Sequence, residues 1–129
     1  MMKTNKKKAL EVMAGIGRNV KVLKMFFPLD KIELLEACPQ YVDKCWETGV
    51  SQVHHKYLHM FATDFTQYGL VLGVWALCYL NVIDINIFLD QACKADTIVL
   101  VEPVLKQEED QRSEKWHDDI GQQMVIRSK

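Results

Sequence analysis

The chain has 129 residues, of which 49% are hydrophobic and 26% are charged, and its formal net charge is −1. A chain of this length forms one domain, and its near-neutral balance lacks the basic excess that is typical of nucleic-acid-binding proteins. No apolar segment reaches the about 20 residues of a membrane-spanning helix, and no apolar stretch follows the N-terminal lysines as in a secretory signal, so we expect a cytoplasmic or nuclear protein that contacts no membrane.

The first expected elements are a strand over 7–13 and a helix over 17–27, joined by a glycine turn. This stretch reads A-L-E-V-M-A-G-I-G-R from Ala9 to Arg18, so an apolar run with an acid leads into two glycines spaced two apart. A strand that stops at such a turn and leads into a helix N-terminus is where α/β folds hold a nucleotide or an adenosyl cofactor. Pro28 ends the helix because proline cannot continue its hydrogen bonding.

The remaining elements alternate in type along the chain. We expect strands over 32–37, 56–61, 68–74 and 97–101, and helices from 39 to about 47 and over 83–94. This order predicts an α/β fold with an open, mostly parallel, Rossmann-like sheet of about five strands flanked by helices. One domain spans 1–129, with a core over about 7–104 and a polar C-terminal segment over 105–129.

Cysteine and histidine spacing argues against a metal site. The four cysteines have no C-x-x-C spacing, and we expect reduced thiols. Three histidines cluster at His54, His55 and His59, but the segment V-H-H-K-Y-L-H-M-F alternates like a strand, whereas this spacing would need a helix and a further ligand to hold zinc. We expect these histidines to serve at the surface or in an interface.

Five motifs occur in a fixed order along the chain. They are E-V-M-A-G-I-G-R at 11–18, L-L-E-A at 34–37, D-F-T at 64–66, Y-G-L-V-L-G-V-W-A-L-C-Y-L at 68–80 and T-I-V-L-V-E-P at 97–103. Together they resemble a class I S-adenosylmethionine-dependent methyltransferase domain, and in particular the protein N-terminal (alpha-amino) methyltransferase family, over about 8–104. The resemblance implies a methyltransferase fold and an S-adenosylmethionine (SAM) pocket at the glycine turn.

The resemblance also implies which residues would hold the cofactor. They are Glu11, Gly15, Gly17, Arg18 and Glu36, with Glu36 bonding the cofactor ribose. Other roles stay open for several of them. Glu36 could cap the helix that Pro39 opens, the two glycines are needed for the turn with or without a ligand, and Arg18 could pair with Asp64 or Glu36.

The chain departs from the family where the chemistry would take place. Met13 stands at the first glycine of the motif, where a side chain is expected to occupy space meant for the methionine part of the cofactor. Gly69, Val74 and Tyr79 replace an acid, a glutamine and a histidine of the family in and after the fourth strand. Pro103 replaces an amide residue at the end of the fifth strand and brings no polar side chain.

Both ends are also shorter than in the family. Only about seven residues precede the first strand, where the family has an N-terminal helical cap, and the family's last helix and antiparallel strand pair are expected to be missing. The strand over 97–101 would then be an apolar edge, which either the C-terminal segment or another protein must cover.

These departures predict a non-catalytic methyltransferase-like accessory subunit, with no catalytic residue and no metal. Its partner would be a larger methyltransferase in a hetero-oligomer, for example in a DNA adenine methyltransferase complex. That partner would bind SAM, while this chain alone binds no cofactor and meets nucleic acid only through the complex. The alternatives are a small active SAM-dependent methyltransferase acting on a protein N-terminus or a small molecule, and an α/β module that binds another nucleotide.

Overall fold

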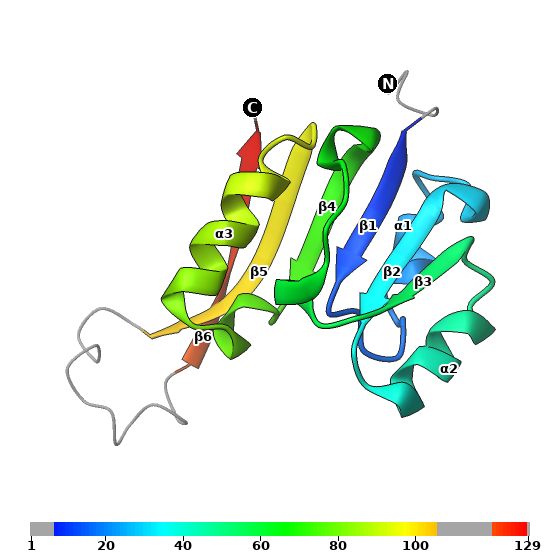
Figure 1. The fold of residues 1–129 in the computed structure, drawn as a ribbon, viewed down its shortest axis with the longest axis horizontal. Coiled ribbons are helices and arrows are strands. Elements are labelled where there is room, and N and C mark those ends of the chain that lie inside the picture. Colours follow the sequence, from blue (N-terminus) through cyan, green and yellow to red (C-terminus); the bar gives the residue numbers. More distant parts are fainter. Residues whose placement is uncertain (1–6, 106–119, 129) are drawn as a thin grey trace.

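A six-stranded sheet organises the computed structural model, which describes residues 7–105 and 120–128 (Figure 1). The strands are β1 (Lys8–Val12), β2 (Ile32–Glu36), β3 (Gln52–His55), β4 (Tyr68–Val74), β5 (Thr97–Leu105) and β6 (Ile120–Ser128). Their order across the sheet is β3-β2-β1-β4-β5-β6. The first five strands are parallel, which confirms the predicted α/β fold with an open, mostly parallel sheet.

The sixth strand was not predicted. β6 pairs antiparallel with β5 from Thr97↔Ser128 to Leu105↔Ile120, so it covers the whole length of β5. The open question of what covers the apolar edge is therefore answered by the C-terminal segment of this same chain. The polar residues at 106–119, also part of the predicted C-terminal segment, lie outside the described residues.

Helices lie on both faces of the sheet (Figure 1). They are α1 (Val20–Leu23), α2 (Pro39–Glu47) and α3 (Val82–Ala92). The described residues also form the short 3-10 turns η2 (Leu29–Lys31), η3 (Leu58–Met60), η4 (Phe65–Gln67) and η5 (Leu77–Tyr79). α1 and α2 share one apolar cluster with Ile32 and Leu34, and α3 shares the other with Leu10 and Leu35. The alternation of β2 side chains between the two clusters fits a strand that is covered on both faces. None of the helices in the described ranges is long and apolar enough to cross a membrane.

Two predicted elements were wrong in extent or place. The helix expected over 17–27 is only α1, because the chain after Leu23 closes tight turns, such as Met25 N–H to Val22 O, before Pro28. The strand expected over 56–61 is instead β3, which pairs with β2 from Glu33↔Gln52 to Glu36↔His55. Beyond His55 the neighbouring strand β2 has ended, so the chain turns into η3.

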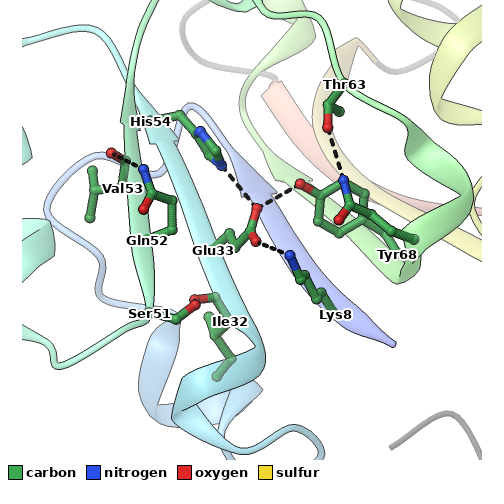
Figure 2. A network of polar contacts seen from close by, with 10 residues as sticks. Lys8, Ile32, Glu33, Ser51, Gln52, Val53, His54, Thr63 and Tyr68 are labelled. Atoms are coloured by element: carbon green, nitrogen blue, oxygen red, sulfur yellow. Dashed lines mark hydrogen bonds and ion pairs between the residues drawn. The ribbon is translucent and has the colours of Figure 1, made fainter. Parts of the chain in front are cut away.

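A buried carboxylate joins four adjacent strands near the amino ends of β1, β2 and β4 (Figure 2). Glu33 of β2 is 5% exposed and accepts hydrogen bonds from Tyr68 Oη at 2.6 Å and His54 Nε2 at 2.9 Å, and Lys8 Nζ lies 2.9 Å away. Burial alone would raise the pKa of Glu33, but the bonds from His54, Tyr68 and Lys8 outweigh it and lower the pKa to about 2. Glu33 therefore stays ionised and links β1, β2, β3 and β4.

Candidate functional site

A cavity of about 650 Å³ opens at the carboxyl ends of β1, β2 and β4. Its walls come from β1 and the following turn, from Glu36 at the end of β2, and from the residues after β4. The strand order reverses here, since β2 lies on one side of β1 and β4 on the other, and open α/β sheets bind ligands at such a point. The volume lies in the range of ligand sites, about 300–1,000 Å³.

Four of the five residues that the sequence assigns to a cofactor line this cavity, namely Glu11, Gly15, Arg18 and Glu36. Gly17 is not among the lining residues. It has a φ of +82°, and a Cβ at this position would lie 3.0 Å from Cγ2 of Thr48. Gly17 is therefore required by the turn and by its close approach to the end of α2.

Glu36 ties the glycine turn to the start of α2. Its Oε1 accepts a hydrogen bond from Gly15 N at 2.6 Å, and its Oε2 accepts one from Cys38 N at 3.0 Å. Cys38 precedes Pro39, the first residue of α2, so Glu36 bonds the residue before the helix and none of the first-turn N–H groups that a helix cap would satisfy. A carboxylate has about four acceptor positions, so two remain for a ligand.

Glu11 is a buried acid with one oxygen unused. Glu11 is 2% exposed, and its Oε2 accepts a hydrogen bond from Asn19 Nδ2 at 2.7 Å. Its Oε1 is buried without a partner among the described residues. Burial, with a smaller contribution from the charge of Glu36, raises the pKa of Glu11 to about 7 against the bond from Asn19. An orphaned carboxylate oxygen in a cavity wall is available to a donor on a ligand.

Two non-glycine residues at the cavity have left-handed backbone conformations. Met13 follows β1 with a φ of +53°, and Trp75 follows β4 with a φ of +56°. Such conformations cost about 1–3 kcal/mol and gather at ligand sites. Met13 forms part of the wall, and the cavity stays open beside its side chain.

The turn after β4 is held by an acid that sequence analysis did not single out. Glu102 Oε2 accepts hydrogen bonds from Ala76 N at 3.1 Å and Leu77 N at 3.0 Å, and Trp75 N donates to Val101 O at 2.7 Å. The acid after the apolar run T-I-V-L-V was the available signal. Pro103, expected at the end of the fifth strand, lies within β5, which continues to Leu105.

The other predicted partners of these residues are arranged differently. Within the described residues Arg18 forms no ion pair with Asp64 or Glu36, and it is exposed. Asp64 instead accepts hydrogen bonds from the backbone N and the hydroxyl of Thr66 at the start of η4. No group of three His, Cys, Asp or Glu side chains in the described ranges could hold a metal ion.

No protein-family model and no curated protein matches this chain. Solved structures do match. A SAM-dependent methyltransferase from Leishmania major superposes with a TM-score of 0.68 at 21% identity, over 81% of this chain and 46% of that one. Geranyl diphosphate C-methyltransferase from Streptomyces coelicolor, in complex with Mg²⁺, geranyl diphosphate and S-adenosyl-L-homocysteine, superposes with a TM-score of 0.71 at 11% identity, over 88% of this chain and 44% of that one.

The chain has the fold of the SAM-dependent methyltransferases. Phosphoethanolamine N-methyltransferase 1 from Haemonchus contortus also matches, with a TM-score of 0.63 at 22% identity, over 75% of this chain and 22% of that one. This methyltransferase-like chain spans less than half the length of each of these three structures.

Proposed function

We propose that this chain is a non-catalytic methyltransferase-like subunit that holds an adenosyl ligand, SAM or its demethylated product S-adenosylhomocysteine, beside a larger methyltransferase. The observation that supports a bound ligand is the buried Oε1 of Glu11, which has no hydrogen-bond partner among the described residues. Glu11 lines the cavity at the carboxyl ends of β1, β2 and β4. In this proposal the chain has its own adenosyl site, in contrast to the sequence-based expectation that only the partner binds the cofactor.

The lining residues fit an adenosyl ligand on three counts. The turn at Gly15 opens into free space, because a Cβ placed there would meet nothing within 4 Å. Glu36 retains acceptor positions for ribose hydroxyls, as the family resemblance implies. A second cavity of about 440 Å³ adjoins the first and shares Met13, Glu36 and Tyr79 with it, which extends the space beside Met13.

The same walls support a role without catalysis. SAM, when bound, supplies a methyl group on a sulfonium centre that an acceptor must attack in line. Val74, Trp75 and Tyr79 form the wall of the cavity next to β4. These three side chains carry no carboxylate, amide or imidazole to orient an acceptor, and orientation supplies much of the rate of such a transfer. Glu102 does not line the cavity. Its Oε2 accepts hydrogen bonds from the backbone N–H groups of Ala76 and Leu77, and its Oε1 is buried without a partner among the described residues.

A protein partner is supported by apolar side chains on the surface. Those with at least two-thirds of their area exposed include Met25, Phe26, Tyr79, Val82 and Ile83. Val82 and Ile83 begin α3, and Tyr79 belongs to η5 just before it, so three of them lie close together in sequence, and Tyr79 also lines the cavity. Exposed apolar side chains that form a contiguous patch mark protein interfaces, and a patch at the start of α3 would supply one. A hetero-oligomer with a larger methyltransferase, such as a DNA adenine methyltransferase complex, fits this surface.

Calorimetric titration of the full chain with S-adenosylhomocysteine tests the ligand. At about pH 8.5, where Glu11 is ionised despite its raised pKa, we expect binding that weakens at least about tenfold in Glu11→Gln and Glu36→Gln, since each change removes a charged hydrogen-bonding group. Asp43→Asn, an exposed acid on α2 outside the cavity, is the matched control and should bind like the natural chain. Absence of binding in the natural chain would refute the adenosyl site.

A methyl-transfer assay tests the absence of catalysis. The chain alone, supplied with isotopically labelled SAM and with peptides bearing free N-termini, should transfer no label above the protein-free rate. Transfer that Glu36→Gln abolishes would instead establish the active methyltransferase that remains the alternative. The subunit role is tested by adding the chain to a methyltransferase that co-purifies with it, whose rate or thermal stability should rise.

A further inference from the structure

Another recess lies between α1 and α2, and it adjoins the proposed adenosyl cavity at Ile16 and Arg18. It has a volume of about 440 Å³, and its lining includes Arg18 of the glycine turn, Lys21 and Lys24 of the α1 segment, and Lys44 of α2. These four residues define the basic groove. All four are exposed, and they come from three separate segments that only the fold brings together.

The positive charge of the basic groove is poorly neutralised. Glu47 is the one acid among its lining residues, and its Oε1 lies 3.9 Å from Lys44 Nζ with both side chains at least 60% exposed, so the pair is weak. Arg18, Lys21 and Lys24 form no ion pair with a carboxylate of the described residues. Two lysines outside the groove are closely paired, Lys7 with Asp96 at 2.8 Å and Lys8 with Glu33 at 2.9 Å. The other described lysines outside it, Lys31, Lys56 and Lys94, form no ion pair within the described residues, so what distinguishes the groove is that its four cations gather around one recess.

The formal net charge of −1 hides this local excess. Averaged over the chain, acids and bases nearly cancel, but a ligand meets the local field within about 10 Å. Four cations around one recess form an electrostatic footprint for a polyanion. Three of the four are lysines, which bind phosphate as point charges without the planar geometry that a carboxylate pair prefers.

We propose that the basic groove binds the phosphodiester backbone of a single-stranded nucleic acid. A recess of this volume admits one strand, whereas a duplex could present only the outside of one backbone to it. The groove joins the adenosyl cavity, since Ile16 and Arg18 line both, and Tyr41, 46% exposed, stands in the cavity wall as a platform for a base. This site does not depend on the adenosyl site or on the absence of catalysis.

Fluorescence anisotropy of a labelled 20-nucleotide oligothymidine with the full chain tests the groove. A single strand releases about 0.7 counterions per neutralised phosphate, so four contacts predict an affinity that falls about 50-fold from about 50 to about 200 mM salt. Lys21→Ala/Lys24→Ala removes two contacts, so the fall over the same range should be only about 7-fold. The matched control is Lys31→Ala/Lys94→Ala, which removes the same charge from lysines outside the groove that form no ion pair within the described residues, and it should keep the natural salt dependence.

Three results would overturn the proposal. One is no binding at about 50 mM salt, and another is an equal change of salt dependence in the groove and control variants. The third is tighter binding of a duplex of the same length, which would place the contact on a flat surface. Because the probe carries no adenosyl ligand, failure here leaves the S-adenosylhomocysteine titration unaffected, and failure of that titration leaves this one unaffected.

Discussion

The backbone N–H of Gly15 donates a 2.6 Å hydrogen bond to Oε1 of Glu36, so the turn after β1 is held by the acid that ends β2. The same carboxylate accepts from Cys38 N through its other oxygen. Glu36 thus fixes the glycine turn on one side of the cavity and ties it to the residue before α2. A site prepared in this way needs less reorganisation on binding, which favours affinity.

Glu36→Gln should destabilise the fold as well as the site. A glutamine side chain has one carbonyl oxygen, so it can accept a hydrogen bond from Gly15 N or from Cys38 N. It cannot replace both of the hydrogen bonds that the charged carboxylate of Glu36 accepts. We expect a loss of about 1–3 kcal/mol in the free energy of unfolding, measured by urea titration. Asp43→Asn, which removes an exposed charge on α2, should change it by less than about 0.5 kcal/mol. Equal stability of the two variants would contradict the structural role of Glu36.

Met13 is expected to prefer glycine over alanine. Its φ of +53° is unfavourable for any residue with a Cβ, by about 1 kcal/mol, and both replacements remove the same long side chain from the cavity wall. Met13→Gly should therefore have a higher free energy of unfolding than Met13→Ala. The gain is about 1 kcal/mol from the relieved backbone conformation, and the greater conformational entropy of glycine in the unfolded chain offsets part of it. Both variants should bind S-adenosylhomocysteine more tightly than the natural chain if Met13 narrows the site. Weaker binding in both would show that the thioether contacts the ligand instead.

The parts of the fold that follow from local pattern could be predicted from the sequence. β1 and β2 are apolar runs that meet a turn signal, and the position of Glu36 at the end of β2 placed it at the carboxyl edge of a parallel sheet. β3 was displaced because the alternation from Val53 to Phe61 continues through the end of the strand into η3. Only the register with β2 shows where pairing stops.

Features that depend on distant residues were not predictable in this way. The acid in I-E-L-L-E gave no sign that Glu33 would meet Lys8, His54 and Tyr68, which lie on three other strands. β6 has only a short apolar run, Met124 to Ile126, and its pairing depends on the edge of β5. The basic groove was not predicted either, because its cations are spread along the chain from Arg18 to Lys44 and the near-zero net charge does not show where positive charge gathers.

Tyr68→Phe should weaken the sheet through Glu33. The change removes the 2.6 Å hydrogen bond to a carboxylate that is 5% exposed, and a buried ionised group that loses a donor cannot replace it with bulk water. We expect a loss of about 1–3 kcal/mol in the free energy of unfolding. Tyr57→Phe deletes the same hydroxyl from a side chain that is 61% exposed and should cost less than about 0.5 kcal/mol. A Tyr68→Phe variant as stable as Tyr57→Phe would show that His54 and Lys8 suffice.

Glu11 should make the fold less stable as the pH rises. Its pKa is raised from 4.5 to about 7, so the folded chain binds the proton more tightly than the unfolded chain does. Between these two values the folded state holds more protons, and the free energy of unfolding falls with increasing pH, by up to about 3 kcal/mol in total. Glu11→Gln removes this titration but keeps an oxygen that can accept from Asn19. We therefore compare the free energies of unfolding of the variant and the natural chain, measured by urea titration. The value for the variant minus that for the natural chain should rise from about pH 4.5 to about pH 7 and stay constant above that range. Histidines and other acids titrate in both chains and cancel from the difference. A difference that is flat across this range would mean that Glu11 is not desolvated, and the orphaned oxygen would then offer no advantage to a ligand.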